Sequence, residues 1–309
     1  MIFENGEDST AVIAGFTIQN GYADQAGGIL CVNSSPHITN CKIINNTAGY
    51  GSGVHSFGSP TISSCMIMAN TSTDYGGGIF FDDYDSSNIS FCSIVNNIAY
   101  TSGAGICCDR SNVNILNCTI TNNSAYMSGA GIYIYDNSNM DITNCIIWGN
   151  DPDEIYVGGN NILNITYSDI QDTLWFGTGN ISCNPTFCDT ANTNFYLDSS
   201  SCCADAGEGG SDIGAYGIGC SFRPDCIYVA GDVNNSSSYN GLDITYGVAY
   251  FKGGNYPLYE CECTPGNTWY VSGDVNGDCL YNGLDIGYGV NYLKGGSALI
   301  SCPDCPPAE

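Results

Sequence analysis

Residues 38–46 read ITNCKIINN and residues 115–123 read ILNCTITNN, and related stretches recur along the first half of the chain. In each, an asparagine follows a cysteine by five residues. The cysteines of these stretches are spaced at intervals of 24, 27, 26 and 27 residues: Cys41, Cys65, Cys92, Cys118 and Cys145. A period of this length indicates a solenoid in which each repeat forms one coil.

A second marker falls between the cysteines, a glycine followed by an isoleucine or valine: Gly28-Ile29, Gly53-Val54, Gly78-Ile79, Gly105-Ile106 and Gly131-Ile132. The repeats alternate apolar and polar residues, favour β-branched types and show no helical period, which predicts strands. We therefore expect a parallel β-helix. Its cysteines and isoleucines would stack in the interior, and its asparagines would form a ladder at a turn. Metal binding by some stacked thiols is the alternative.

Charge and cysteine content limit the class of protein. Aspartate and glutamate number 31 against 5 lysines and arginines, for a formal net charge of −26. This charge excludes electrostatic binding of nucleic acid and disfavours anionic membranes, and no apolar run of about 18 residues predicts membrane insertion. The 19 cysteines indicate an extracellular or cell-surface location. Because their number is odd, at least one has no partner within the chain.

The start of the chain lacks the basic and apolar regions of a signal peptide, and residues 10–20 already resemble a coil. We expect the first coil to present an open edge, which either missing residues or another subunit would cover. Asn-x-Ser/Thr sequons, among them Asn88 and Asn164, fall mostly on predicted turns. They make the chain a glycoprotein where the source glycosylates such sites.

The coils are predicted to span residues 1–172, followed by an irregular, cysteine-rich capping segment over 173–222. The segment contains the stretches 184–187 (NPTF), 204–207 (ADAG) and 212–216 (DIGAY). Together with the coils, it resembles the closing part of secreted bacterial right-handed β-helix repeat proteins. That resemblance implies irregular strands laid over the last coil as a cap.

Residues 223–309 contain a duplication with an offset of 42, in which GDVN at 231–234 recurs at 273–276 and YNGLDI at 239–244 recurs at 281–286. Oxygen-bearing residues occupy alternate positions, as in a twelve-residue loop that wraps Ca²⁺. The first candidate ligand set is Asp232, Asn234, Ser236, Ser238, Asn240 and Asp243. The second is Asp274, Asn276, Asp278, the Leu280 carbonyl, Asn282 and Asp285. A short helix is expected over 286–294, ended by two glycines.

Two such loops, each followed by a helix, resemble type I dockerin modules, which are EF-hand-like, calcium-dependent partners of cohesins. The chain departs from that pattern where Ser237 and Cys279 replace glycine and where Ser236 replaces an acidic ligand. We therefore expect the second loop to bind Ca²⁺ better than the first. The tails carry two further cysteine pairs, which we interpret as disulfide staples or as a four-cysteine zinc site: Cys261 with Cys263, and Cys302 with Cys305.

The coils offer little of the chemistry that polysaccharide lyases need. Lyases acting on acidic sugars neutralise the substrate carboxylate with arginine or lysine. The coils contain Lys42 and Arg110, on different coils and different sides of their repeats. The two histidines, His37 and His55, also stand apart, and we expect both at the surface.

An acidic cluster is the strongest candidate for catalysis. Asp82, Asp83 and Asp85 lie on one predicted coil, Asp109 on the next and Asp136 beyond it. Their carboxylates could stack about 5 Å apart, within the range of glycosidase pairs. We interpret the cluster instead as a solvated turn or an incidental Ca²⁺ site.

The sequence thus predicts a mainly β, non-enzymatic, extracellular structural protein: a right-handed parallel β-helix rod joined to a small α-helical, calcium-stabilised docking module. Its partner would be a cohesin-like domain or a neighbouring copy, joined head to tail into filaments. One alternative is a dockerin-borne glycoside hydrolase or polysaccharide lyase. Another is a carbohydrate-binding adhesin, which needs an exposed aromatic strip. The candidates for that strip are Tyr133, Tyr135, Phe80 and Phe81.

Overall fold

The computed structural model describes residues 1–82, 86–171, 174–190, 192–220, 229–234, 236, 238–254, 261–264, 267–269, 273, 275–276 and 280–300, with the backbone alone at 261–264 and 267–269. The chain divides into two units. The first comprises residues 1–187, 194–197 and 201–218, and the second comprises 188–193, 198–200 and 219–309. Asp83, Asp85, Asp274, Asp278, Cys279, Cys302 and Cys305 lie outside the described residues, as do the side chains of Cys261 and Cys263.

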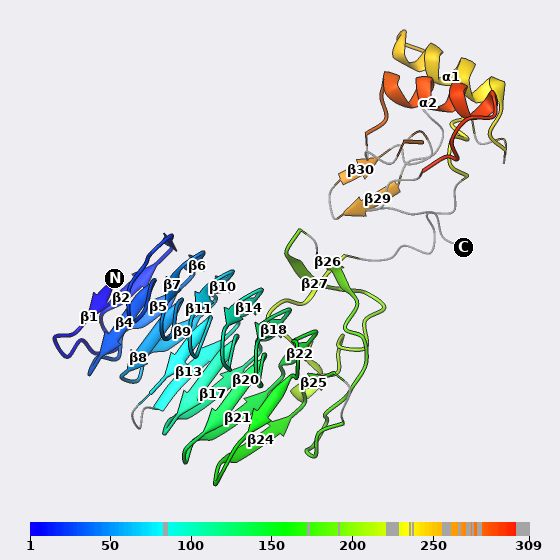
Figure 1. Cartoon of the computed structure of the whole chain (residues 1–309). Coiled ribbons are helices and arrows are strands. Elements are labelled where there is room, and N and C mark those ends of the chain that lie inside the picture. The colour runs from blue at the N-terminus through cyan, green and yellow to red at the C-terminus, as the bar shows by residue number, and fades with distance from the viewer. Residues whose placement is uncertain are drawn as a thin grey trace. The chain divides into compact units, whose positions relative to one another are not determined.

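Parallel sheets run along the first unit, and successive coils contribute successive strands (Figure 1). Sheet A contains β1 (Ile2–Phe3), β4 (Ile29–Val32), β8 (Val54–Phe57), β12 (Ile79–Phe81), β16 (Ile106–Asp109), β20 (Ile132–Tyr135) and β23 (Ile155–Val157). Sheet B contains β2 (Val12–Ala14), β5 (His37–Thr39), β9 (Thr61–Ser63), β13 (Ser86–Ser90), β17 (Asn112–Leu116), β21 (Asn139–Thr143) and β24 (Ile162–Thr166).

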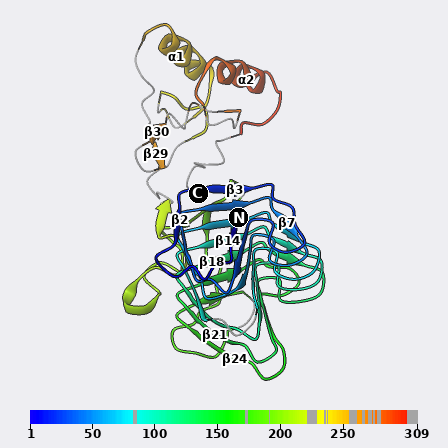
Figure 2. The same cartoon turned by 90° about the vertical axis from the view of Figure 1, so that its left-hand side faces the viewer.

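Two further sheets complete the coils. Sheet C contains β3 (Thr17–Gln19), β6 (Lys42–Ile44), β10 (Met66–Met68), β14 (Ser93–Val95), β18 (Thr119–Thr121), β22 (Ile146–Trp148) and β25 (Asp169–Ile170). The short sheet D contains β7 (Thr47–Ala48), β11 (Thr71–Ser72), β15 (Ile98–Ala99) and β19 (Ser124–Ala125). Figure 2, turned so that the N-terminal coils face the viewer, shows the coils lying one behind another. The predicted parallel β-helix is confirmed.

Isoleucine columns fill the interior of the coils. Sheets A, B and C each stack isoleucines or valines in register, as in the pairings of Ile62 with Ile89 and of Ile89 with Ile115. These side chains are 0–1% exposed, and burying each contributes about 1.5–3 kcal/mol. The turn that ends each strand of sheet B uses the left-handed region, for example at Asn40 with φ 51° and Asn117 with φ 50°. Asparagine adopts this region more readily than most residues.

The cysteines of the repeat form a buried column of free thiols, as expected. The backbone N–H of Cys41 donates to Sγ of Cys65 over 3.4 Å, and the N–H of Cys65 donates to Sγ of Cys92 over the same distance. Each thiol also donates within its own turn, as Cys65 does to the Ser63 carbonyl at 3.2 Å. The column thus satisfies backbone donors that β-bridges leave unpaired at this corner.

The predicted asparagine ladder is also present. Asn46, Asn70, Asn97, Asn123 and Asn150 are buried and follow one another on successive coils. Each of the first four donates its side-chain amide to Oδ1 of the next, over 2.9–3.0 Å. The same amides donate backwards to a backbone carbonyl, as Asn97 does to Ile67 at 3.0 Å. The ladder therefore connects each coil to the coils on both sides.

The segment after the last coil closes the end of the solenoid. Trp175 packs against the interior isoleucine cluster. The backbone N–H of Ile170 donates to the Ile181 carbonyl over 3.2 Å, and Asn180 donates its amide to the Ile165 carbonyl over 2.9 Å. These contacts cover the last coil.

The stretch around Gly214-Ala215-Tyr216 does not lie over the last coil. It runs back along the outward face of sheet C. The backbone N–H of Ala215 donates to Oγ1 of Thr119 over 3.0 Å. The Tyr216 hydroxyl lies 3.1 Å from Oγ of Ser93, a residue one coil further back. A Cβ on Gly214, whose φ is +104°, would press against the Ile146 side chain. The small residue is required for this close approach.

The capping segment contains β26 (Phe187–Asp189), β27 (Asn194–Asp198) and β28 (Ile218–Cys220), which form a three-stranded sheet, and a 3₁₀ turn at Glu208–Gly210. Two disulfides occur here, Cys183–Cys202 and Cys188–Cys220. The second unit contains α1 (Gly241–Phe251), α2 (Gly283–Leu293) and an antiparallel pair, β29 (Cys261–Thr264) and β30 (Asn267–Trp269). Neither helix, in the part of the chain that the structure describes, is long and apolar enough to span a membrane.

Candidate functional site

Each half of the C-terminal duplication folds into a loop followed by a helix with a capping box. The Asn240 side chain accepts the N–H of Leu242 at 2.9 Å, and the Asp243 carboxylate accepts the N–H of Asn240 at 2.8 Å. Asn282 and Asp285 repeat this arrangement at α2. Because these pairs satisfy first-turn N–H groups, α2 begins at residue 283, three residues before the expected start.

The two helices pack through a reciprocal pair of contacts. A Cβ on Gly247 would clash with the hydroxyl of Tyr281, and a Cβ on Gly289 would clash with that of Tyr239. Each tyrosine precedes one helix and reaches the glycine of the other. Tyr250 stacks on Tyr281 with ring centroids 5.7 Å apart. The duplication therefore forms one packed pair, in which each repeat completes the core of the other.

Buried oxygens gather in the first loop. Asp232 is 5% exposed and Asp243 is 1% exposed. Oδ1 of Asp232 accepts the backbone N–H of Ser236 at 2.7 Å. Oδ1 of Asp243 accepts the backbone N–H of Asn234 at 3.4 Å. Burial raises the pKa of the Asp243 carboxyl, and the charge of Asp232 acts in the same direction against the backbone donors. The two carboxylates thus face each other in a dry environment.

Oδ1 of Asn234 is buried in this loop and has no hydrogen-bond partner among the described residues. Such an orphaned acceptor is costly, by about 1–3 kcal/mol. The remaining predicted ligands of the first loop, Ser238 and Asn240, are also close to it in sequence. The Ser238 carbonyl accepts from Asn240 at 3.3 Å and from the Ser236 hydroxyl at 3.1 Å. All of these donor atoms are oxygens, the ligand type that Ca²⁺ prefers.

The second loop is described in part. Asp285 is 1% exposed, and its carboxylate accepts the N–H of Val275 at 3.1 Å and that of Asn282 at 2.7 Å. The Leu280 carbonyl accepts from the Asn282 amide at 3.4 Å. Asn276 forms a parallel bridge with Ile300. Since Asp274 and Asp278 lie outside the described residues, the expectation that this loop binds Ca²⁺ better stays a prediction.

A second candidate surface lies on the outward side of sheet A. The register places Leu30, His55, Phe80, Cys107, Tyr133 and Tyr156 in one outward column. The turns before β8 and β12 fold Tyr50 and Tyr75 over this column. We call Tyr50, Tyr75, Tyr133, Tyr135 and Tyr156 the tyrosine face.

The rings of the tyrosine face form a continuous series of contacts. Centroids lie 6.4 Å apart for Tyr50 and Tyr75, 6.2 Å for Tyr75 and Tyr133, and 5.1 Å for Tyr133 and Tyr156. Tyr135 lies 6.0 Å from Tyr75. Tyr50 and Tyr156 are 37% and 41% exposed. Aromatic contacts of this kind add about 0.5–1.5 kcal/mol each, so the face is partly ordered by its own stacking.

The aromatic candidates from the sequence divide between two sides of the sheet. Tyr133 and Tyr135 point outward and are half-buried. Phe80 also points outward but is 3% exposed, because Tyr50 and Tyr75 lie against it. Phe81 points into the solenoid and is fully buried. Neither phenylalanine therefore contributes to an exposed aromatic strip.

The acidic cluster sits at the edge of the tyrosine face and surrounds a cation. The Arg110 guanidinium lies 2.8 Å from Asp82, 3.2 Å from Asp109 and 3.6 Å from Asp136. One arginine thus joins aspartates of three successive coils. Burial raises the pKa of Asp109, while Arg110 and a hydrogen bond from Tyr135 oppose the shift. Asp82, Asp109 and Asp136 therefore form an ion-pair network around Arg110.

A family model described as the right handed beta helix region matches residues 2–170 and, in a second, overlapping match, residues 61–263. The chain belongs to this family. The comparison with curated proteins found no match. The comparison with solved structures found none either.

In this right-handed β-helix, the two histidines have different positions. His37 is half-buried, and its Nε2 lies 2.9 Å from Oγ of Ser63 on the next coil. His55 is 1% exposed, which contradicts the expected surface position. It lies against Phe57 and Phe80, with centroids 4.4 and 4.9 Å away, and beneath Tyr50. Neither ring nitrogen has a hydrogen-bond partner among the described residues, and burial lowers the pKa of His55 to about 4.

Sequence reasoning missed two elements of this right-handed β-helix. The first is Arg110, whose side chain reaches one coil back to Asp82 and one coil forward to Asp136. A signal was present, since the three aspartates recur every 27 residues. The second is the pair Tyr50 and Tyr75, which occupy matching positions before Gly51 and Gly76 and so repeat with a spacing of 25.

Proposed function

We propose that this chain is an extracellular structural protein in which the β-helix is a rigid rod and the paired loop–helix repeats are a calcium-dependent docking module. The observation that carries the calcium assignment is Oδ1 of Asn234, which is buried and has no hydrogen-bond partner among the described residues, in the same loop as the buried carboxylate of Asp232 and close in sequence to that of Asp243. A bound Ca²⁺ would be coordinated by all three oxygens. It would give the Asn234 oxygen a partner and reduce the repulsion between the two carboxylates. Asn240 and Asp243 cap α1, so the ion would also order that helix.

One feature supports an extracellular setting, and a second supports the role of a rigid rod. The capping segment contains the disulfides Cys183–Cys202 and Cys188–Cys220, which persist in oxidising compartments. The ladders of thiols and asparagines join every coil to its neighbours through buried hydrogen bonds. A solenoid held in this way is suited to maintain a fixed separation between what its two ends contact.

The docking role is supported by an apolar residue repeated on the surface of the helix pair. Leu242 is 68% exposed and Leu284 is 70% exposed, and they occupy equivalent positions in the first turns of α1 and α2. Exposed leucines of this kind favour a protein partner. We assign that partner as a cohesin-like domain or a second copy of this chain, the latter joined head to tail in filaments.

Calcium binding is tested by calorimetric titration of the chelator-treated full chain. We expect heat of binding in the wild type and a loss of at least one site in Asn234→Ala and Asp243→Asn. Asp141→Asn, a change at an exposed coil aspartate, is the matched control and should bind as the wild type does. Equal binding by all four proteins would overturn the ligand assignment.

The partner is tested by sedimentation velocity and electron microscopy of the full chain in Ca²⁺ and in EGTA. Growth of mass and filaments in Ca²⁺, abolished in a Leu242→Asp/Leu284→Asp variant but not in Leu116→Asp, would establish self-assembly. A monomer that binds a cohesin domain under the same dependence would establish the other partner. If the chain does neither, the docking role is wrong.

The tyrosine face favours a second candidate function, the binding of a neutral polysaccharide. Its stacked rings extend across several coils, each step being about 4.8 Å, and tyrosine rings stack on the faces of sugar rings. The net charge and the adjacent aspartates disfavour acidic glycans. Affinity electrophoresis in gels containing a neutral glucan should retard the wild type more than Tyr133→Ala and Tyr156→Ala. Tyr126→Ala, an exposed tyrosine elsewhere, is the control. Equal mobility of all variants would exclude binding at this face.

A further inference from the structure

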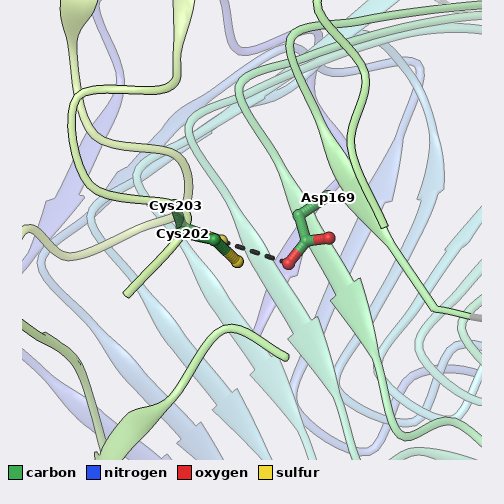
Figure 3. A group of neighbouring side chains, drawn as sticks. All are labelled: Asp169, Cys202 and Cys203. Carbon is green, nitrogen blue, oxygen red and sulfur yellow. Dashed lines mark hydrogen bonds between the residues drawn. The ribbon is translucent and has the colours of Figure 1, made fainter. Parts of the chain in front are cut away.

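Three cysteines and a buried aspartate meet where the capping segment contacts the last strand of sheet C. Asp169 begins β25 and is 0% exposed. One of its carboxylate oxygens and the sulfurs of Cys202 and Cys203 all lie within 4.8 Å of one another. Cys183 is bonded to Cys202, so its sulfur is at the same place. Figure 3 shows the Asp169 carboxylate directed at Cys203.

The environment of Asp169 is unusual for a carboxylate. Oδ2 accepts the thiol hydrogen of Cys203 over 3.1 Å, and Oδ1 accepts the backbone N–H of Cys183 over 3.0 Å. The surrounding side chains are apolar and include Ile146, Leu197 and Ile213. No salt bridge reaches Asp169 within the described part of the chain. A buried acid without a neighbouring cation is costly.

The pKa values of both Asp169 and Cys203 are raised in this environment. Burial raises the pKa of Asp169 to about 6. Burial also raises the pKa of the Cys203 thiol, and the charge of Asp169 raises it further. The Cys203 thiol therefore keeps its proton and donates it in the hydrogen bond to the Asp169 carboxylate. A divalent cation would replace that proton and stabilise both anions.

We propose that, when the Cys183–Cys202 disulfide is reduced, Cys183, Cys202, Cys203 and Asp169 form a four-ligand Zn²⁺ site. Three thiolates and one carboxylate are donors that Zn²⁺ accepts in tetrahedral structural sites, with Zn–S distances of about 2.3 Å. Binding displaces the three thiol protons to solvent, and no sulfur changes its oxidation state. Asp169, Cys202 and Cys203, whose donor atoms lie within 4.8 Å of one another, would move slightly closer together around the ion. The sulfurs of Cys183 and Cys202, which are bonded in the oxidised chain, would move apart after reduction.

The site would tie together three chain segments: the end of the last coil at Asp169, the loop at Cys183 and the returning segment at Cys202 and Cys203. The disulfide joins the last two of these. In the reduced chain Zn²⁺ would hold the cap in place. In the oxidised chain the disulfide holds the cap, and Cys203 remains a free thiol that is hydrogen-bonded to Asp169. The cap is therefore held in either redox setting.

The first test uses the wild-type full chain reduced with a phosphine. Cys202 is exposed and Cys203 is buried, so alkylation of Cys202 followed by peptide mass spectrometry reports on the site. We expect added Zn²⁺ to slow this alkylation, because the thiolate is both the reactive form and the form that binds the metal, and we expect a chelator to restore the rate. An unchanged rate would overturn the proposal without the need for any variant.

The second test compares Co²⁺ complexes of reduced variants. Cys203→Ser should weaken the thiolate-to-cobalt charge-transfer band and lower the affinity for Co²⁺, which is measured by competition with a chelator. Asp169→Asn should lower the affinity alone. Cys145→Ser, which removes a buried coil thiol, should leave both unchanged, as should Cys188→Ser. Circular dichroism of the oxidised variants checks folding. If Cys203→Ser and Asp169→Asn bind Co²⁺ as the wild type does, the four residues are not a metal site.

Discussion

Oδ1 of Asn97 accepts two hydrogen bonds from Asn70, one from its backbone N–H and one from its side-chain amide, both over 3.0 Å. The Asn97 side-chain amide in turn donates to Oδ1 of Asn123 on the next coil and to the Ile67 carbonyl on the previous coil. Each ladder asparagine is therefore both donor and acceptor for two coils. This explains why the turn requires an amide at that position rather than another polar group.

Replacing Asn97 by alanine should destabilise the rod more than replacing an exposed asparagine. The change leaves the buried donors of Asn70 without their acceptor, at a cost of about 1–3 kcal/mol. Urea unfolding of the full chain measures the difference. Asn114→Ala is the matched control, because its bond to Asn88 is exposed and should contribute little. Comparable midpoints for the two variants would contradict the ladder as a source of stability.

The thiol column should be inert to alkylation in the native protein. Burial raises the pKa of Cys92 and Cys118 well above the ordinary value, and the thiolate is the reactive form. Since the native pKa is raised, the protonated thiols favour folding below the unfolded pKa of about 8.5, and that contribution is lost as pH rises beyond it. Iodoacetamide labelling should be negligible until urea is added, whereas an Asn114→Cys variant labels at once. Rapid native labelling of Cys92 would show that the coils open.

Arg110 should contribute to stability at neutral pH and much less in acid. Its three ion pairs are partly exposed, so each is worth about 0–1 kcal/mol. Arg110→Met leaves Asp82, Asp109 and Asp136 facing one another. Burial raises the pKa of the Asp109 carboxyl, so its protonation in acid should remove its ion pair and reduce the difference between the variant and the wild type. Urea unfolding at both pH values tests this. Lys42→Met, at the exposed coil lysine, should show no such dependence.

The acidic cluster should not hydrolyse polysaccharides, because Arg110 already pairs with the carboxylates that a glycosidase would use as acid and base. We expect no release of reducing ends from neutral or acidic glycans by the wild type, and no change in Asp109→Asn or Asp136→Asn. Turnover that is lost in Asp109→Asn but kept in Asp141→Asn would instead make the chain an enzyme.

The features that the sequence predicted are those that recur once per coil. Cys92 and Asn97 identify their columns because parallel strands keep one register from coil to coil, so a spacing in sequence becomes a position in space. Arg110 occurs once and gave no such signal, although the aspartates that it contacts recur every 27 residues. The reach of Arg110 across three coils, and the pairing of Cys183 with Cys202, depend on rotamers and loop paths that no period encodes.

The duplicated module shows the same limit. The oxygen spacing predicted which residues gather, and the structure brings Asp232, Asn234 and Asp243 together. It did not predict that Asn240 and Asp243 would also cap α1, because a capping box and a calcium loop use the same residue types at the same spacing. The two roles are compatible if the ion binds the carboxylate oxygens on the side away from the backbone donors.

His55 offers the sharpest test of the packing on sheet A. Its ring lies among Tyr50, Phe57 and Phe80 with both nitrogens unpartnered in the described structure. His55→Phe should therefore stabilise the rod at neutral pH by about 1–3 kcal/mol, since it removes the desolvation of two polar atoms and keeps the ring.

The pH dependence of the same variant follows from the lowered pKa of His55, about 4. Because the unfolded chain binds the proton more tightly, with a pKa of about 6.5, the wild type should lose stability as pH falls from 6.5 to 4. His55→Phe should lack this part of the acid loss, and Phe80→Leu, which keeps the histidine, should retain it. Urea unfolding midpoints between pH 7 and pH 4 decide the matter. Parallel pH profiles for wild type and His55→Phe would mean that the imidazole is solvated after all.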